Sequence, residues 1–326
     1  LLMEYTTLGN TGLEVSRLAL GCMSFGSSDW REWVLDEEKS REIIDRAIDL
    51  GINFFDNANL YSNGESERVL GNALEGRRDE MVVTTKCYYQ MDEQDPNTQG
   101  LSRKTIEQEL EASLGRLGMD AVDIFMAHRW DYDTPIDVSL NAFDDAVRRG
   151  NARYIGASSM WAWQFAESLH TSEQENLEQF EVMQNHYNLL YREEEREMYP
   201  LTQEKNIGVM TYSPLARGNL AMPFEEFEDT TRGSSDPWAH DYPYREGGGP
   251  EINRRVQELA DEKDATMAQI SLAWLLHKEY VDVPIIGCDS IEHLEQSVAA
   301  LNISLSDSDM DWLEEPYEPL PVAGHR

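Results

Sequence analysis

Polar side chains close a series of short apolar runs in this sequence. From the second run to the seventh, the closing residues are Asp56, Lys86, His128, Ser158-Ser159, Gln184 and Tyr212-Ser213. A carboxylate, an ammonium and an imidazole are groups that hold and move protons in enzymes, and amides and hydroxyls orient small molecules. Apolar runs that ended at random would not deliver such groups repeatedly, so the pattern predicts an active site.

Each of these side chains also has a plainer explanation when it is taken alone. Asp56 could cap a loop, Lys86 could be an exposed lysine, and His128 could be a buried histidine with its hydrogen bonds satisfied. Lys86 stands apart, because only six of the 27 basic residues are lysine and this one closes the apolar run MVVTT. We therefore interpret Lys86 as an ammonium that the chemistry requires.

The runs that carry these side chains alternate with helical patterns along the whole chain. Eight short, β-rich runs lie at 18–21, 54–56, 81–86, 123–128, 153–158, 180–184, 207–212 and 283–287. Strands that alternate with helices form parallel sheets, and eight such units favour a closed (β/α)8 barrel, the TIM-barrel fold, over an open sheet. Active sites of these barrels lie at the carboxyl ends of the strands. We expect residues 1–326 to form one such domain.

Two segments fall outside this repeat. Residues 4–17 predict a hairpin that turns at residues 9–12 and closes the bottom of the barrel. Residues 213–250, after the seventh strand, contain a stretch rich in proline, glycine and aromatic residues. A loop of this length is usually functional or disordered, and we favour an active-site loop.

The helical segments carry start and stop signals. The first is expected over residues 36–50. Thr134 followed by Pro135 predicts an N-cap with proline at the first helical position, and Thr266 with Gln269 predicts a capping box. No apolar run approaches the ~20 residues that a membrane-spanning helix needs, and the first residues lack the features of a signal peptide.

Acidic residues dominate the charge of the chain. It has 62 Asp and Glu against 27 Lys and Arg, a formal net charge of −35 and a pI near 4.4. This excess argues against a nucleic-acid partner, which needs a basic surface. Self-repulsion of this size needs screening by salt, so we expect a salt-rich setting, the cytoplasm of a halophilic archaeon; an ordinary acidic enzyme is the alternative. The widely spaced Cys22, Cys87 and Cys288 predict packing roles in a reducing, cytoplasmic compartment.

Several motifs, in order along the chain, resemble those of the aldo-keto reductase superfamily. They are GINFFDNANLYSNGESERVLGNAL at 51–74, VVTTK at 82–86, DIFMAHRWD at 123–131, YIGASS at 154–159, VMQNHYNLL at 182–190, TYSPLARGNL at 211–220 and PIIGCDSIEHLEQSV at 284–298. The sequence is similar in particular to the branch of aryl-alcohol dehydrogenases and potassium-channel β subunits. The resemblance implies a soluble oxidoreductase that uses NAD(P)H to reduce aldehydes or ketones to alcohols.

The resemblance also implies a catalytic tetrad of Asp56, Tyr61, Lys86 and His128. Carbonyl reduction needs a hydride at carbon and a proton at the developing alkoxide, and a tyrosine with an ordinary pKa of about 10 relays that proton slowly near neutral pH. Lys86 would lower the pKa of Tyr61, while Asp56 holds Lys86 in place. Tyr61 is then the general acid in reduction, and His128 orients the carbonyl oxygen. No metal is expected, because the seven histidines lack metal-binding spacing.

The same resemblance implies a nicotinamide cofactor, with NADPH placed first and NADH as the alternative. Ser158 and Gln184 would hold the carboxamide, and Tyr212 would stack on the nicotinamide ring. The 213–218 segment would cradle the pyrophosphate with Arg217, whereas a Rossmann site is rejected because the chain has no G-x-G-x-x-G. The expected cofactor contacts are Gly21, Cys22, Met23, Asp56, Ser158, Ser159, Gln184, Tyr212, Ser213, Pro214, Leu215, Arg217, Gly218, Gly287, Asp289, Ser290, His293 and Gln296.

Asp289 departs from the pattern of that superfamily. Relatives that prefer NADPH commonly carry Ser or Arg at this position. A carboxylate would repel a 2′-phosphate but would suit a free ribose hydroxyl. Alternatively, Asp289 caps the following helix, with Glu292 as its capping-box partner. Both interpretations stand open on the sequence.

Aromatic residues are the candidates for a substrate pocket suited to aldehydes. They are Trp30, Trp33 and Trp130, joined by Trp161, Trp238 and Tyr242. Trp161 and Trp163 fit helix packing equally well. The expected partner is a small carbonyl compound or alcohol, with neither nucleic acid nor membrane, and the oligomeric state is left open. The alternative function is a nucleotide-binding, redox-sensing module of the channel β-subunit type with little turnover.

Overall fold

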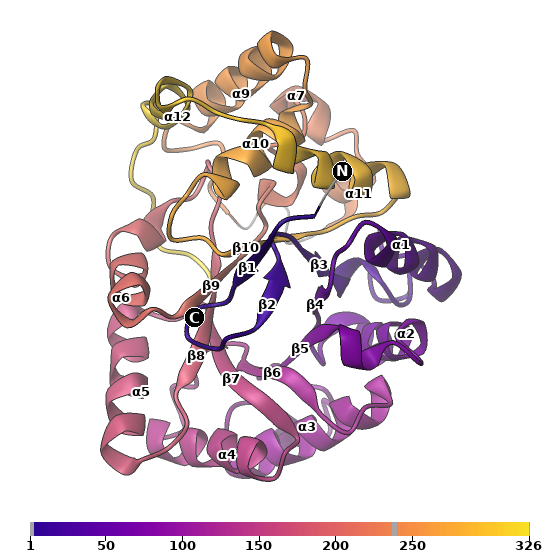
Figure 1. Ribbon diagram of the computed structural model, residues 1–326, viewed down its shortest axis with the longest axis vertical. Coiled ribbons are helices and arrows are strands. Elements are labelled where there is room, and N and C mark those ends of the chain that lie inside the picture. The colour runs from indigo at the N-terminus through magenta and orange to yellow at the C-terminus, as the bar shows by residue number, and fades with distance from the viewer. Residues whose placement is uncertain (1–2, 237–239, 241, 326) are drawn as a thin grey trace.

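Eight parallel strands close into a barrel in the computed structural model, which describes residues 3–236, 240 and 242–325 (Figure 1). The strand order β10-β3-β4-β5-β6-β7-β8-β9 follows the chain around the barrel. The predicted (β/α)8 fold is therefore confirmed. The barrel strands are β3 (Ala19–Gly21), β4 (Phe54–Asp56), β5 (Val82–Cys87), β6 (Val122–Ala127), β7 (Ala152–Ser158), β8 (Phe180–His186), β9 (Gly208–Tyr212) and β10 (Val283–Ile286).

Helices surround the barrel and bury one apolar face each against it or against one another (Figure 1). In α1, for example, Ile43, Ile44 and Ala47 are buried at helical spacing. The helices are α1 (Glu37–Asp49), α2 (Glu65–Ala73), α3 (Arg103–Leu117), α4 (Ile136–Arg148), α5 (Ala162–Glu175), α6 (Met198–Lys205), α7 (Phe224–Phe227), α8 (Thr231–Ser235), α9 (Gly249–Lys263), α10 (Met267–Leu276), α11 (Ile291–Ala299) and α12 (Asp307–Glu314).

The helix caps agree with the sequence at one predicted position and differ at another. The capping box of Thr266 and Gln269 is confirmed at the start of α10, where each side chain accepts a hydrogen bond from the backbone N–H of the other. The cap predicted for α4 is wrong by one position, because Pro135 itself is the N-cap. The hydroxyl of Thr134 instead donates a hydrogen bond to Oδ2 of Asp131 at 2.7 Å. The side chain that was expected to cap the helix therefore binds a carboxylate in the preceding loop.

The predicted hairpin is confirmed and closes one end of the barrel. Strands β1 (Tyr5–Thr7) and β2 (Glu14–Ser16) pair antiparallel, and Leu8 and Val15 are fully buried in the cluster that fills the barrel interior. Gly9 has a φ of +50°, and a Cβ there would lie 2.2 Å from the backbone nitrogen of Gly208. The turn therefore needs glycine, because it lies directly against the start of β9.

The apolar residues form one layer inside the barrel and another between its outer face and the helices. Side chains of successive barrel strands fill the interior together with the hairpin. Cys22, Cys87 and Cys288 belong to the outer layer, where all three thiols are buried and free. Their predicted packing role is confirmed.

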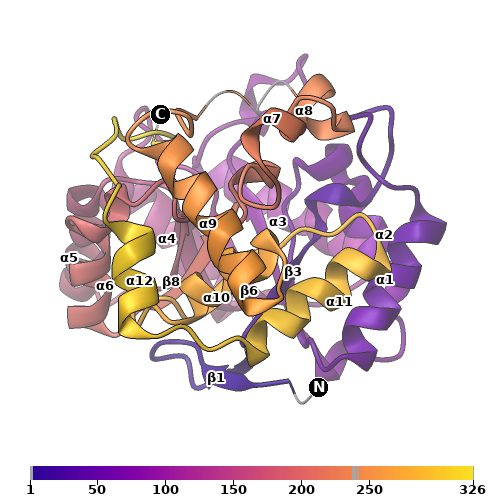
Figure 2. The same cartoon turned by 90° about the horizontal axis from the view of Figure 1, so that it is seen from above.

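The long segment after β9 lies on the side of the barrel opposite the hairpin. It contains a 3-10 turn at Ala216–Gly218 and the short helices α7 and α8, before α9 begins at Gly249. Figure 2 shows β1 and the N-terminus on one side of the molecule, with α7, α8 and the C-terminal end on the other. This segment thus lies on the side of the strand carboxyl ends. Trp238, one of the predicted pocket residues, lies outside the described residues.

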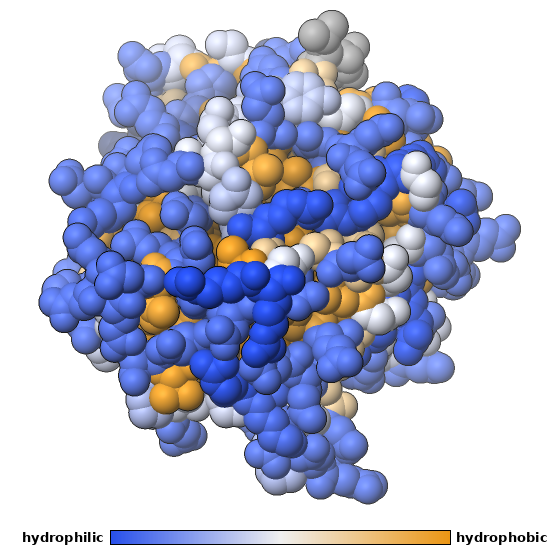
Figure 3. All heavy atoms as spheres, turned by 60° about the horizontal axis from the view of Figure 1, so that its bottom comes forward, coloured by the Kyte–Doolittle hydropathy of each residue, from blue (hydrophilic) through white to orange (hydrophobic). Residues whose placement is uncertain are grey.

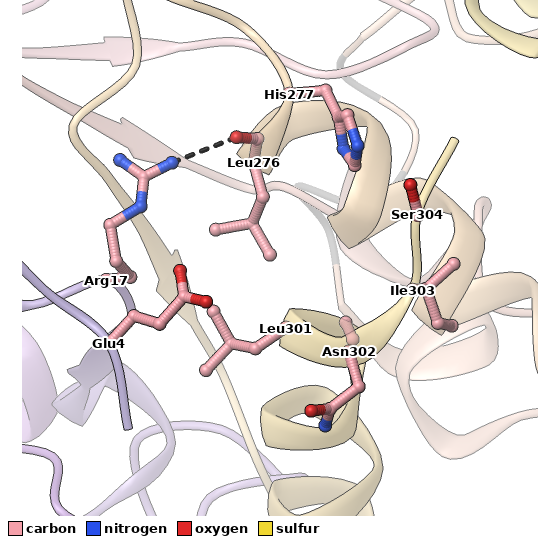
Figure 4. Close-up of a pocket in the computed structure, with 9 residues that line it drawn as sticks. Glu4, Arg17, Leu276, His277, Leu301, Asn302, Ile303 and Ser304 are labelled. Atoms are coloured by element: carbon pink, nitrogen blue, oxygen red, sulfur yellow. Dashed lines mark hydrogen bonds between the residues drawn. The ribbon is translucent and has the colours of Figure 1, made fainter. Parts of the chain in front are cut away.

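A cavity of about 320 Å³ lies on the hairpin side, away from the polar strand ends. Arg17 reaches into it and donates to the carbonyl oxygens of Leu276 and Asp282 at 2.9 and 2.7 Å (Figure 4). The guanidinium thereby joins the end of the hairpin to α10 and to the start of β10. Its hydrogen bonds go to backbone, so we assign Arg17 a structural role.

The surface of the protein is strongly hydrophilic. Hydrophilic residues cover most of the face shown in Figure 3, with small apolar areas between them. Many surface arginines pair with carboxylates, as Arg46 does with Glu295 at 2.7 Å. In the described part of the chain, no helix combines the length and the apolar character that crossing a membrane requires.

Candidate active site

A buried ion pair between Asp56 and Lys86 occupies the centre of the candidate site. Nζ of Lys86 lies 2.8 Å from each carboxylate oxygen of Asp56 and donates at 2.8 Å to the carbonyl oxygen of Asn57. The side chains of Lys86 and Asp56 are 0% and 3% exposed. Oδ1 of Asp56 also accepts from Thr84 at 2.7 Å and from Gln184 at 2.8 Å. These hydrogen bonds offset the cost of removing two charges from water.

Tyr61 and His128 lie beside this pair. Nζ of Lys86 is 5.4 Å from the centroid of the Tyr61 ring, and the rings of Tyr61 and His128 have centroids 6.1 Å apart, nearly perpendicular to each other. Tyr61 opens a turn in which Ser62 and Asn63 adopt left-handed φ angles of 49° and 52°. The structure therefore brings together the four residues that the sequence predicted as catalytic.

A second hydrogen-bond network holds the segment that carries Tyr61. Asn59 donates to Oε2 of buried Glu109 at 2.9 Å, which fixes the segment against α3. Buried Glu67, in α2, accepts the hydroxyl hydrogen of Thr85 from β5. The elements on both sides of Tyr61 are thus tied to the strands and helices around it.

Burial raises the pKa of Tyr61 well above its ordinary value of 10, and the negative charge of Asp56 raises it further, while Arg129 acts in the opposite direction. The predicted lowering of this pKa by Lys86 is wrong. The sequence argument counted the charge of Lys86 but not the loss of water around the phenol, and Lys86 is already neutralised by Asp56. Tyr61 therefore holds its proton at neutral pH.

Burial has the opposite effect on His128, since the ionised form of histidine is the protonated one. Burial lowers the pKa of His128 well below its ordinary value of 6.5, and the positive charges of Arg129 and Lys86 lower it further. Nδ1 of His128 is buried and has no hydrogen-bond partner among the described residues. A neutral imidazole in this position can donate one hydrogen bond to a substrate oxygen.

The residues predicted to bind nicotinamide lie on neighbouring strands. Ser158 and Gln184 are directly opposite each other in the β7–β8 register. Tyr212 ends β9, and its hydroxyl lies 3.0 Å from Oγ of Ser159. The ring of His186 lies nearly parallel to that of Tyr212, at an angle of 14° with centroids 5.3 Å apart. Ser159 thus holds the hydroxyl of Tyr212, and His186 covers one face of its ring. A ring fixed in this way can stack on a planar ligand with its other face.

The segment after Tyr212 has the backbone of an anion-binding turn. Ser213, Ala216, Arg217 and Gly218 all have left-handed φ angles, of 53°, 48°, 59° and 110°. The N–H groups of Ala216 and Gly218 donate within the turn, to the carbonyl oxygens of Ser213 and Leu215, both at 2.9 Å. The side chain of Arg217 is only 10% exposed, its Nε is buried without a hydrogen-bond partner among the described residues, and its Nη1 lies 3.9 Å from Asp236. These features fit a pyrophosphate.

The remaining predicted cofactor contacts lie at the ends of β3 and β10. Gly21 pairs with Asp56 in the β3–β4 register, and Cys22 and Met23 follow in a 3-10 turn. Pro214 and Leu215 belong to the turn after β9. Those on the β10 side are Gly287, Asp289, Ser290, His293 and Gln296, which follow the strand or lie in α11.

The helix-cap interpretation of Asp289 is wrong. Ser290 is the N-cap of α11, and its Oγ accepts a hydrogen bond from the backbone N–H of His293 at 3.2 Å. The carboxylate of Asp289 instead contacts Nδ1 of His293. This pair lowers the pKa of Asp289 and raises the pKa of His293, mainly through their mutual hydrogen bond.

The three tryptophans predicted for the substrate pocket form two separate groups. Trp30 and Trp33 have ring centroids 6.3 Å apart, and Trp33 packs under the guanidinium of Arg232 at 4.6 Å. Trp130 packs instead on Trp163, with centroids 6.0 Å apart. An open hollow of about 520 Å³ beside the Tyr61 turn is lined by Gly26, Ser27, Asp29, Trp30, Ser62, Asn63 and Glu65.

Comparison with known proteins agrees with this geometry. The model of the aldo/keto reductase family matches residues 17–318. The chain belongs to the aldo/keto reductase family. The protein is therefore an oxidoreductase of a family that reduces carbonyl groups and generally uses NAD(P)H.

Several fungal proteins of this family resemble the chain. The chain is 40% identical over 347 residues to aldo-keto reductase dtxS3 of Metarhizium robertsii, covering 99% of this chain and 93% of the relative. It is 39% identical over 343 residues to versiconal hemiacetal acetate reductase of Aspergillus parasiticus, covering 98% of each. A Schizosaccharomyces pombe protein named as an aryl-alcohol dehydrogenase is 40% identical over 345 residues, covering 98% of this chain and 97% of the relative. These fungal relatives do not support the archaeal source predicted from the acidic composition.

Sequence reasoning missed two residues of this site, Arg129 and His186. Arg129 directly follows His128, and His186 lies two residues after Gln184. His128 and Gln184 are both polar residues that close apolar runs. The scarcity of lysine, which singled out Lys86, gives no signal for Arg129, because most of the basic residues are arginine. His186 carried no signal either, because only its stacking on Tyr212 shows what it does.

Because the pKa of Tyr61 is raised, we expect carbonyl reduction to keep its rate well into the alkaline range. The general acid stays protonated until pH passes above ~10, whereas alcohol oxidation, which needs the phenolate, should rise with pH over the same interval. The measurement is kcat/KM in both directions from about pH 6 to 10, with circular dichroism at each pH as the control for folding. A loss of reduction near pH 7 would show that the pKa of Tyr61 is lowered.

Proposed function

We propose that the protein is an NADPH-dependent reductase that converts aldehydes or ketones to alcohols by direct hydride transfer, with Tyr61 as general acid. The observation that supports this most strongly is the placement of protonated Tyr61 and neutral His128 beside the buried Asp56–Lys86 pair. NADPH, when bound, supplies the hydride. The positive-φ turn at 213–218 supports the binding of its pyrophosphate, as does the buried Nε of Arg217, which has no hydrogen-bond partner among the described residues.

The residues of the chain then have distinct tasks. His128 donates a hydrogen bond to the carbonyl oxygen and fixes its direction. Tyr61 transfers its phenolic proton to that oxygen as negative charge develops there, which leaves a phenolate. Arg129 carries positive charge that favours this phenolate, whereas Lys86 is paired with Asp56. Asp56 and the carbonyl of Asn57 keep the ammonium of Lys86 in place.

We propose aromatic aldehydes as the first substrates to test. Relatives bear the names aryl-alcohol dehydrogenase and versiconal hemiacetal acetate reductase. In this chain the rings of Tyr61 and Tyr89 both lie nearly perpendicular to the ring of His128, at centroid distances of 6.1 and 5.0 Å. Such a border suits a planar apolar substrate.

We expect Tyr61→Phe to remove most turnover, by about 1,000-fold in kcat, because the oxygen loses its proton donor while the ring is kept. NADPH affinity, measured by quenching of tryptophan fluorescence, should change little. Tyr88→Phe is the matched control, since it deletes a phenol hydroxyl that follows the end of the neighbouring strand. Turnover that survives in the Phe variant refutes Tyr61 as the acid. NADPH binding without turnover in the unmodified protein would favour the nucleotide-sensing alternative.

We place NADPH first and NADH second, with Asp289 as the residue that decides between them. The ion pair with His293 reduces the repulsion that the carboxylate would exert on a 2′-phosphate. Asp289→Arg should raise the ratio of kcat/KM for NADPH to that for NADH by about 10- to 100-fold, because a guanidinium binds phosphate. Glu292→Gln, in the first turn of α11, removes one negative charge nearby and serves as the control. An unchanged ratio places Asp289 outside the cofactor site.

We propose a cytoplasmic, salt-rich setting for the enzyme. The three buried free thiols suit a reducing compartment, and the formal charge of −35 suits one with abundant counterions. The melting temperature should rise steadily as KCl is raised to molar concentrations, where the screening length falls to about 3 Å. Sucrose at the same osmolality is the control for excluded-volume effects. A melting temperature that does not change with KCl concentration supports the alternative of an ordinary acidic enzyme.

A further inference from the structure

Arg129 lies at the mouth of the barrel, directly after His128. Its Nη1 donates to the carbonyl oxygen of His128 at 2.6 Å, and its guanidinium carbon is 5.6 Å from the centroid of the Tyr89 ring. That ring packs edge-on against the imidazole of His128, with centroids 5.0 Å apart. The guanidinium is therefore held on the substrate side of the tetrad, on the border that Tyr89 and His128 share.

The neighbours of Arg129 show which way its charge faces. Its largest electrostatic interactions are with tyrosines from four different parts of the mouth: Tyr61, Tyr89, Tyr212 and Tyr242. Tyr61 follows β4 and Tyr89 follows β5. Tyr212 ends β9, and Tyr242 lies in the long segment after it. A group influenced from all these directions faces the centre of the mouth rather than the solvent around it.

The absence of a carboxylate beside Arg129 is unusual in this protein. Over residues 3–236, 240 and 242–325, no Asp or Glu comes within ion-pair distance of its guanidinium, although the chain has 62 of them. By contrast, Arg217 and Arg232 at the same face share buried Asp236, at 3.9 and 3.3 Å. Arg17 has no ion pair either, but it donates to backbone carbonyls. A largely enclosed guanidinium with no carboxylate beside it can pair with an anionic group of a ligand.

We propose that Arg129 binds a carboxylate of the substrate, so that the enzyme acts on aldehydes or ketones that carry an acid group away from the reacting carbonyl. This inference rests on the proposed function, since it places the carbonyl at Tyr61 and His128. A guanidinium matches a carboxylate with two parallel hydrogen bonds, and the surrounding phenols can donate more. A cofactor phosphate is the other anion within the family's chemistry, but the 213–218 turn with Arg217 already offers it a separate site.

The test compares two substrates that differ only in charge, 4-formylbenzoate and its neutral methyl ester, in molar KCl. Salt screens the long-range repulsion between an anion and the acidic surface but acts less on an enclosed pair. The unmodified enzyme should prefer the acid in kcat/KM. Arg129→Gln should lower the acid-to-ester ratio by about 10- to 100-fold, and Arg129→Lys should lower it less.

Arg149→Gln is the matched control, because Arg149 is 56% exposed after the end of α4 and the change removes the same charge. Its acid-to-ester ratio should equal that of the unmodified enzyme. An unchanged ratio in Arg129→Gln overturns the proposal. So does a rise in the KM for NADPH with an unchanged ratio, which would assign Arg129 to the cofactor.

A ligand-binding measurement keeps the proposal testable if the Arg129 variants fail to fold. Benzoate should bind the unmodified protein and compete with the aldehyde, whereas benzamide, of the same shape but neutral, should bind at least about tenfold more weakly. Equal binding of the two overturns the proposal. If the protein turns over no aldehyde with either nicotinamide cofactor, the proposed function fails instead, and the benzoate titration still reports on Arg129.

Discussion

The enclosure of a carboxylate and an ammonium inside the barrel is the constraint on which the rest of the site depends. An ion pair removed from water is tolerated only when its remaining hydrogen bonds are made, and a barrel of parallel strands can supply them from several directions. Asp56, which ends β4, receives hydrogen bonds from Thr84 and Lys86 of β5 and from Gln184 of β8. Three strands therefore meet at one carboxylate. Moving β4 or β5 would separate the two buried charges, and moving β8 would remove a hydrogen bond from the carboxylate.

The same dry environment sets the protonation states around the pair. Burial favours the neutral form of every titratable group, so Tyr61 keeps its proton and His128 lacks a second one. A protonated phenol and a neutral imidazole are the forms that suit proton donation to an oxygen and hydrogen bonding to it. The positive charge of Arg129 adds to the lowering of the pKa of His128 and opposes the raising of the pKa of Tyr61.

The sequence was sufficient for the barrel and for the residues at its strand ends, because both follow from short-range patterns: apolar runs, caps and the polar residue that closes each run. It was insufficient wherever the outcome depended on the surroundings. The pKa of Tyr61 follows from burial, Ser290 provides the cap that one of the two open interpretations assigned to Asp289, and Arg129 stands out only once every nearby carboxylate is located. The strong acidity of the chain is likewise a property of its surface. Against so many carboxylates, a cation at the mouth without one beside it is easy to recognise.

The central claim is that Asp56 and Lys86 act as one unit, and a double-mutant cycle on the free energy of unfolding tests it most directly. Asp56→Asn and Lys86→Met should each destabilise the protein by about 3 kcal/mol or more, because each leaves a buried charge without its partner. The double variant should cost at least ~2 kcal/mol less than the sum of the two, since it removes both charges. Costs that add to within ~0.5 kcal/mol would show that the two residues are independent and would contradict this account of the site.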